Sequence, residues 1–171
     1  SFPTRRSSDL QSFVNPSYGP NGIELMENGV SAKEVLKKLT DQDEGKDFRQ
    51  AAMLDVNGSV SAFTGEKCIE SAGHFVGENF SVQANMMLND KVIPAMKKAF
   101  QDNSSLPLAE RIIKVFEAAE SVGGDIRGKQ SAALIVVGAE KTSNVWEDKK
   151  IDLRVDDNSN PIKEIKRLLK V

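Results

Sequence analysis

The sequence predicts a layered α+β fold, and three observations indicate it. Asn57-Gly58 separates two extended runs within residues 49–63, which is a strong signal for an antiparallel hairpin. Residues 131–137 (SAALIVV) are apolar on both alternating sides, which is typical of a strand that is covered on both faces. Other segments repeat apolar residues at helical spacing. Hairpins together with sheet-covering helices predict an α+β sandwich with antiparallel sheets.

Two helices are expected before the hairpin. Residues 15–22 (NPSYGPNG) are rich in Pro, Gly and Asn and indicate a turn that opens a short helix, which Gly29 ends. The next helix begins with a capping box at Ser31 and Glu34. Its buried stripe is predicted to comprise Val35, Leu36 and Leu39. A third strand is predicted over residues 80–85.

The second half is predicted to run helix, helix, strand, strand, helix. The first of these helices starts near Pro94 and the second near Pro107, and Gly123-Gly124 ends the second. Residues 151–156 (IDLRVD) alternate, which indicates a strand with one apolar and one charged face. Asn160-Pro161 is a start signal for the last helix, which points four side chains inward: Ile162, Ile165, Leu168 and Leu169.

The 171 residues suit one domain, predicted over residues 11–171. Residues 1–10 (SFPTRRSSDL) resemble the translation of a common sequencing-adapter oligonucleotide, and we interpret them as a non-native segment outside the fold. A signal peptide would continue with an apolar run, whereas polar residues 7–9 follow the two arginines. A flexible basic arm is the alternative. The adapter interpretation implies that the native N-terminus is missing.

Composition excludes several function classes. With 39% hydrophobic and 28% charged residues the chain can build a core, and a net charge of -2 gives it no general attraction to nucleic acid or anionic membranes. No apolar stretch approaches membrane-spanning length. The single cysteine rules out an internal disulfide and indicates no compartment. No cofactor and no metal are predicted.

The loop of residues 123–131 (GGDIRGKQS) is the first candidate site. Its Gly and Lys spacing is similar to a phosphate-binding loop, but Gln130 stands where Ser or Thr would bind magnesium, and the loop leaves a helix rather than a strand. Asp125 and Arg127 can instead bind a zwitterionic or amide group, and Gln130 adds a donor and an acceptor. The alternative is an Asp–Arg pair that only fixes a turn.

Two other polar groups are candidates. Asp156 and Asp157 follow a strand and can hold a divalent cation or an ammonium group, although neighbouring strand residues point to opposite faces and Asp is also common in turns. Gln83 and Asn85 share one face of a predicted strand and can donate to an oxyanion, or can simply face solvent.

Cys68 and His74 are the only residues of their types and lie close in sequence. A cysteine nucleophile with a histidine base is conceivable. Closeness in sequence is poor evidence, however, because catalytic partners usually meet only in the fold, and a lone cysteine is more often a small buried residue.

Seven stretches together resemble a known bacterial and archaeal family, the domain of unknown function 1028 family, which is grouped with the N-terminal-nucleophile (Ntn) hydrolases. They occur in family order and span most of residues 11–171: FVNPSYGPNG, DFRQAAMLDVNGSV, FTGEKCIESAGH, NFSVQANMM, LAER, GGDIRGKQSAALIVV and DLRVDDNSNPI. The resemblance implies a four-layer αββα sandwich with antiparallel sheets and an amide-bond hydrolase.

Three departures limit what the resemblance carries over. Relatives begin with further strands, whereas here QSFVNPSYG follows residues 1–10 directly, so the first strands are expected to be missing. In Ntn hydrolases the nucleophile is the first residue of the first strand, and its own amine is the base. Ser1 is not assigned that role, and the catalytic residues stay unknown. A family stretch similar to DDHP reads DDNSNP here, and relatives often continue past the last helix.

From this we expect one pocket that binds substrate through Asp125, Arg127, Gln130, Asn85, Asp156 and Asp157. Arg127 would bind a carboxylate or carbonyl oxygen, and the aspartates would orient an amine or a metal. The expected partner is a small-molecule or peptide amide, without nucleic acid or membrane, and a homo-oligomer is possible. Without the nucleophile strand no acyl transfer is expected. The alternative is a non-enzymatic domain that binds a ligand or a protein on the same fold.

Overall fold

The computed structural model describes residues 7–140 and 142–170. Contacts divide the chain into a first unit, residues 1–86, and a second unit, residues 87–171. The described residues form five α-helices and seven strands, and every strand pairing is antiparallel. The predicted α+β class with antiparallel sheets is confirmed. Over the described ranges, no helix has the length and apolar character that a membrane crossing requires.

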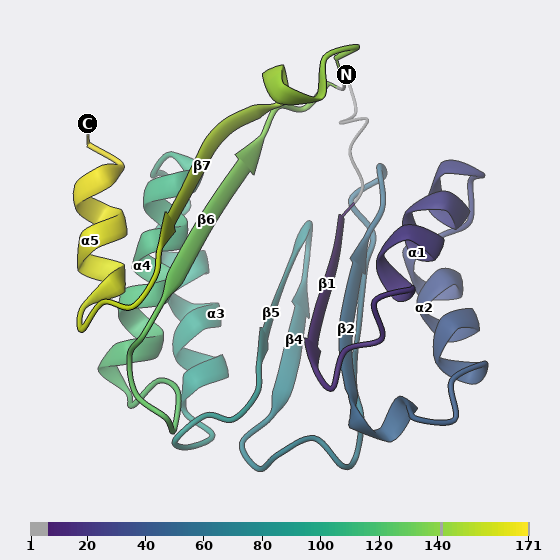
Figure 1. The fold of residues 1–171 in the computed structure, drawn as a ribbon, viewed down its shortest axis with the longest axis horizontal. Coiled ribbons are helices and arrows are strands. Elements are labelled where there is room, and N and C mark those ends of the chain that lie inside the picture. The colour runs from purple at the N-terminus through teal and green to yellow at the C-terminus, as the bar shows by residue number, and fades with distance from the viewer. Residues whose placement is uncertain (1–6, 141, 171) are drawn as a thin grey trace. The chain divides into compact units, whose positions relative to one another are not determined.

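In the first unit, two helices cover a three-stranded sheet. The sheet order is β1-β2-β3, and a separate two-stranded hairpin is formed by β4 and β5. Figure 1 shows α1 and α2 on one face of the sheet and the β4–β5 hairpin on the other. The elements are β1 (Ser7–Ser12), α1 (Tyr18–Glu27), α2 (Ala32–Asp41), the 3-10 turn η1 (Lys46–Phe48), β2 (Arg49–Leu54), β3 (Val60–Thr64), β4 (Gly73–Gly77) and β5 (Phe80–Ala84).

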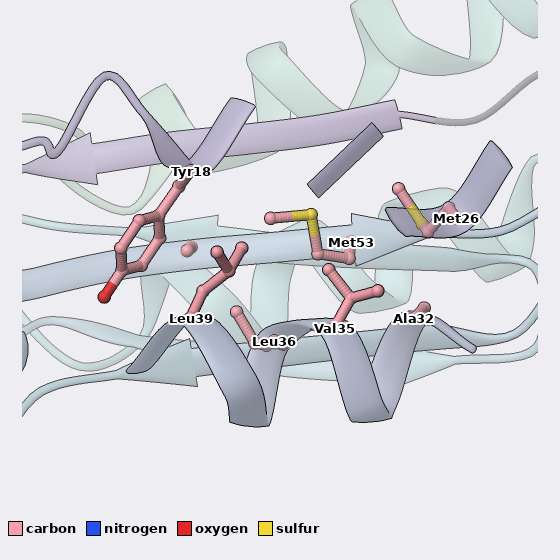
Figure 2. Packing of buried hydrophobic residues seen from close by; sticks show 8 residues of the cluster. Tyr18, Met26, Ala32, Val35, Leu36, Leu39 and Met53 are labelled. Carbon is pink, nitrogen blue, oxygen red and sulfur yellow. The ribbon is translucent and has the colours of Figure 1, made fainter. Parts of the chain in front are cut away.

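The core of the first unit lies between the helices and the sheet. The Ser31 hydroxyl accepts a hydrogen bond from the Glu34 amide and the Glu34 carboxylate accepts one from the Ser31 amide, so the predicted capping box is present. It starts α2 in the register that buries its predicted stripe. Figure 2 shows this stripe facing Met53 of β2, with Tyr18 and Met26 of α1 closing the cluster.

The hairpin predicted at Asn57-Gly58 is confirmed, and Asp55 organises its turn. The Asp55 carboxylate accepts hydrogen bonds from the amides of Asn57 at 2.9 Å and Ser59 at 3.1 Å. Gly58 has a φ of 80°, in the left-handed region that glycine tolerates. The same carboxylate accepts from the Ala32 amide at 3.1 Å, so it also ties the turn to the start of α2.

Part of the segment expected to lie outside the fold forms a strand. β1 pairs along its length with β2, from Ser7 opposite Leu54 to Ser12 opposite Arg49. Strand pairing uses backbone groups, which any sequence provides, and Leu10 also packs against the core. Residues 7–10 therefore cannot be left out of the fold. Residues 1–6 lie outside the described residues, and the adapter origin of the segment stays a prediction.

The strand β4 was not predicted from the sequence. Its residues GHFVG alternate weakly in exposure and have a glycine at each end. Glycine weakens a strand because it loses more backbone entropy on folding and has no side chain to pack. The local sequence signal for a strand is therefore poor. Pairing with the predicted strand β5, from Gly73 opposite Ala84 to Gly77 opposite Phe80, completes the hairpin.

In the second unit, β6 and β7 form an antiparallel pair, α4 and α5 pack against one face of it, and α3 packs along α4. The core contains Ile113 of α4, Leu134 of β6 and Ile165 of α5, each at most 3% exposed. α3 begins two residues before Pro94. The elements are α3 (Val92–Asp102), α4 (Leu108–Ser121), β6 (Ala132–Val137), the 3-10 turn η2 (Val145–Glu147), β7 (Lys149–Val155) and α5 (Pro161–Leu168).

That residues 131–137 are covered on both faces stays a prediction, because within the second unit the helices cover one face only. Leu134 is 3% exposed, whereas its neighbour Ile135 is 57% exposed. Ile135 pairs with Asp152 on β7 and Ala133 pairs with Arg154, so the face away from the helices also carries charged side chains. This face is therefore mixed, with apolar residues on β6 and charged residues on β7.

The carboxylate of Asp43 joins α1, α2 and β2 of the first unit. It accepts hydrogen bonds from the hydroxyl of Tyr18 at 3.0 Å, Nε of Arg49 at 2.9 Å and the backbone amide of Gly45 at 2.7 Å. The bond from Arg49 is the largest cause that holds the pKa of Asp43 well below its ordinary value. Burial, followed by the bond to Asp43, raises the pKa of Tyr18.

We predict that Asp43→Asn lowers the free energy of unfolding at pH 7 by about 2 kcal/mol, because hydrogen bonds to a charged group are worth about 1.5–3 kcal/mol. Folding favours the ionised carboxylate, so its contribution is complete above the ordinary aspartate pKa of about 3.9 and is lost as the pH falls toward the lower folded value. Urea unfolding of both proteins at pH 7 and pH 3 measures this. A variant whose deficit is as large at pH 3 as at pH 7 would contradict it.

Candidate functional site

The loop between α4 and β6 begins with two glycines that end the helix. Gly123 and Gly124 have φ values of 126° and 61°, and their amides donate to the carbonyls of Glu120 at 3.1 Å and Ala119 at 3.0 Å. These bonds satisfy carbonyls that the end of a helix leaves free. The chain can then leave α4 sharply and enter the turn that contains Asp125.

Asp125 and Arg127 form a bidentate ion pair within this turn. Nε of Arg127 donates to Asp125 at 2.9 Å and Nη2 at 2.6 Å, while the Arg127 amide donates to the same carboxylate at 2.8 Å. Arg127 lowers the pKa of Asp125, and Asp125 raises that of Arg127. The pair therefore fixes the turn, in agreement with the alternative to ligand binding for these two residues. Its stabilising effect is small, since the Arg127 side chain is 68% exposed.

The same turn lines a cavity of about 770 Å³ within the second unit. Asp125, Arg127, Gln130 and Asp157, four of the predicted site residues, lie in its wall. The backbone amide of Asn158 donates to the Gln130 carbonyl at 2.8 Å and holds the turn after β7 beside the start of β6. The remaining lining residues are Phe116, Glu120, Gly128, Lys129, Ser131, Ala132, Ala133, Pro161 and Ile162.

The charges in this cavity are unevenly matched. Arg127 is paired with Asp125, and Nζ of Lys129 lies 3.0 Å from the Glu120 carboxylate. Within the described ranges, no hydrogen bond or ion pair reaches the Asp157 carboxylate, nor the side-chain amide of Gln130. The cavity thus contains an unmatched negative charge beside an amide that can donate and accept. Such a wall suits a ligand with an ammonium group or N–H donors.

Two predicted residues are not among the residues that line this cavity within the second unit, and the expectation of one pocket formed by all six stays a prediction. Asp156 directly follows β7 and is not among the residues that line the cavity, and its carboxylate accepts from Nε of Arg154 at 2.9 and 3.0 Å. Asn85 belongs to the first unit. It directly follows β5 and is 9% exposed.

Cys68 and His74 are each bonded to other groups. The Cys68 thiol donates to the Arg49 carbonyl at 3.4 Å, and Nδ1 of His74 lies 2.8 Å from the Thr64 hydroxyl. Although the His74 side chain is exposed, desolvation by the protein atoms around its ring lowers its pKa. These contacts give no support to a Cys–His dyad. Across the described part of the chain, no three His, Cys, Asp or Glu side chains gather as a metal site would need.

Glu120 and Lys129 are cavity residues that sequence reasoning missed. Lys129 drew attention only as part of a phosphate-binding pattern. Glu120 lies in the last turn of α4, nine positions before Lys129, and no sequence spacing identifies such a pair. Only the sharp turn after α4 brings the two together at 3.0 Å.

Comparison with known proteins agrees with this fold. The sequence profile of the Family of unknown function (DUF1028) matches residues 8–165. A crystal structure of protein SPO2555 from Silicibacter pomeroyi, itself described as a DUF1028 protein, superposes with a TM-score of 0.82 at 27% sequence identity. The match covers 95% of this chain and 68% of that one. No curated protein matches. Because the family profile spans nearly the whole sequence, this chain belongs to the DUF1028 family.

Proposed function

We propose that the cavity of the second unit binds a small molecule or peptide end that presents an ammonium group beside an amide. The observation that carries this proposal is the unmatched Asp157 carboxylate, in a wall whose other charges are paired. An ammonium group beside Asp157 would form a charge-assisted hydrogen bond, worth up to about 1 kcal/mol because this carboxylate is exposed. Gln130 is available for the neighbouring amide.

The pairing in the wall changes the role expected of Arg127. Both Nε and Nη2 already bind Asp125, so a ligand carboxylate would have to compete for the guanidinium with a carboxylate fixed two residues away. Arg127 therefore serves to shape the turn and to neutralise Asp125. Recognition of the ligand falls to Asp157 and Gln130.

We predict that Asp157→Asn weakens the binding of a small amino-acid amide, such as alaninamide, about three- to fivefold, since an ion pair at an exposed carboxylate is worth up to about 1 kcal/mol. Asn can adopt the backbone conformation of this position, because Asp157 has a φ of 49° and Asn tolerates the left-handed region. Isothermal titration at low salt measures the affinity.

The matched control is Asp156→Asn, which removes the same charge from the neighbouring residue outside the cavity wall. It should leave the affinity within about twofold of the original chain. Equal weakening by both variants would show a general charge effect and no site at Asp157.

Amide-bond hydrolysis is the second candidate, and the layered arrangement of each unit favours it. In each unit helices cover one face of an antiparallel sheet, while among the described residues no helix of the same unit lies on the other face. The four-layer αββα sandwich of the Ntn hydrolases combines two such halves. We propose this architecture for the chain.

The cavity wall itself offers no activated nucleophile. Ser131 is the one hydroxyl among its lining residues, which include no histidine or cysteine that could act as base or nucleophile. Binding without chemistry is therefore the function we propose for this cavity.

We predict that the chain hydrolyses none of a panel of aminoacyl p-nitroanilides, measured as p-nitroaniline release against a buffer blank. The same titrations should still show binding of the amide, so that a failure of binding and an absence of chemistry are told apart. Turnover that survives Ser131→Ala would place a nucleophile elsewhere in the chain. Turnover abolished by that change would make the cavity an active site.

A further inference from the structure

The first unit contains a polar layer where an apolar interior is expected. Stacked antiparallel sheets normally bury apolar side chains between them. Here the face of the three-stranded sheet opposite α1 and α2 meets the β4–β5 hairpin through polar residues. We name this set the inner polar layer: Asp9, Gln11, Gln50, Thr64, His74, Gln83 and Asn85.

Strand register brings the layer together. Gln11, Gln50 and Thr64 are directly opposed across β1, β2 and β3. His74 and Gln83 are opposed across the hairpin. The two rows are bonded to one another, because the Thr64 hydroxyl contacts His74 at 2.8 Å. Hydrogen bonds from Gln50 to the hairpin complete the link.

Gln50 has a fixed orientation within the layer. Its Nε2 donates to the carbonyls of Gly73 at 3.0 Å and Ala84 at 3.1 Å, and to the Thr64 hydroxyl at 3.0 Å. Backbone carbonyls only accept, so the nitrogen must face them and Oε1 must face away. Gln50 is 1% exposed, and its Oε1 finds no partner among the described residues.

Three further buried side-chain atoms lack a hydrogen-bond partner among the described residues. Oε1 of Gln83 and both polar atoms of the Asn85 side chain are without a hydrogen-bond partner in the described structure. Each such atom costs about 1–3 kcal/mol when it is left unpaired. The next residue, Met86, has a φ of 58°, which is uncommon for a side chain of its kind. A chain selected for stability alone would place apolar residues at these positions.

The unpaired atoms determine which hydrogen-bonding groups a ligand must present. They offer three carbonyl-type oxygens and a single NH₂ group, so acceptors outnumber donor groups. The Asp9 carboxylate already accepts from the side-chain amides of Gln11 at 3.0 Å and Gln83 at 2.9 Å, so it is not among the unpaired acceptors. Exposure falls across the layer: His74 is exposed, Gln83 is partly exposed, and Gln50 and Asn85 are buried.

We propose that the inner polar layer binds a small neutral ligand through N–H donors, with the primary amide as its chemical class. Such a ligand donates to Gln50 and Asn85 oxygens and accepts from the Asn85 NH₂. All residues of the layer lie in the first unit, whereas the residues that line the cavity around Asp157 lie in the second.

The test is a titration of the ¹⁵N-labelled chain with acetamide, followed through the side-chain NH₂ resonances of Asn85 and Gln50. Acetate has the same shape but only accepts, and glycerol donates through hydroxyl groups. We expect acetamide at millimolar concentration to shift both resonances, and acetate to leave them unchanged. The Asp157→Asn variant should respond in the same way, which separates this site from the cavity of the second unit.

The decisive variant is Asn85→Leu, which keeps the shape and removes the unpaired amide. We expect it to abolish the acetamide response of Gln50 while Tm stays equal or rises by up to about 4 °C, since an unpaired buried group is removed. Asn21→Leu, at an exposed position of α1, is the matched control and should retain the response. If Asn85→Leu does not fold, the acetamide titration and the Tm measurement are made on Asn85→Ala instead.

Three results would overturn the proposal. They are an absent acetamide response in the original chain, a response that survives removal of the Asn85 amide, and a Tm that falls by more than about 4 °C in both Asn85 variants. The last would show that Asn85 is part of the hydrogen-bonded framework. A response to glycerol alone would replace the amide with a hydroxyl-bearing ligand and would equally refute the proposed class.

Discussion

The side-chain amide of Gln50 is the contact on which the first unit depends most. From the middle strand of the sheet it donates to carbonyls on both strands of the β4–β5 hairpin, at the open end where Gly73 and Ala84 face each other. A two-stranded hairpin is at best marginally stable alone. These bonds therefore attach the hairpin to the sheet, and they do so with polar groups where most proteins use apolar packing.

Polar contacts on this side of the sheet leave some buried atoms unpaired, which lowers stability. The helix-covered side of the same sheet is packed with Met53, Val35 and Leu39 in the ordinary way, so the chain can build an apolar core. On the other side the amides leave oxygens without partners. Buried polar groups with this pattern are expected at sites of function, where local stability is given up for binding. The second unit shows the same division, with a dry helix-facing side of β6 and β7 and an opposite side that carries charged and exposed residues.

Much of the fold could be predicted from local signals. The capping box at Ser31, the Asn57-Gly58 turn and the glycine end of α4 each depend on a few neighbouring residues, and the structure contains all three. The two-sided cover of β6 stays a prediction, because the face away from α4 and α5 carries charged residues of the partner strand as well as the apolar run itself. The strand β4 was missed because two of its five residues are glycine.

The candidate sites show the same limit. Asp125, Arg127 and Gln130 lie in one loop, so their grouping follows from the sequence, whereas Asp157 joins them only through the bond between Asn158 and Gln130. The pairing of Arg127 with Asp125 leaves Asp157 as the unmatched charge, and no sequence spacing indicates this. Gln50 had no signal at all, since a glutamine at the start of a strand is usually solvated.

The central claim is that amides of the first unit are left unpaired in order to bind a ligand. A high-resolution crystal structure of the chain, determined with and without acetamide, tests it most directly. The account predicts that the ligand-free crystal shows Oε1 of Gln50 and the Asn85 amide bonded to no protein group, and that acetamide appears within hydrogen-bond distance of both. A ligand-free crystal in which these atoms are bonded to other protein groups would contradict it, because nothing would then remain for a ligand to bind.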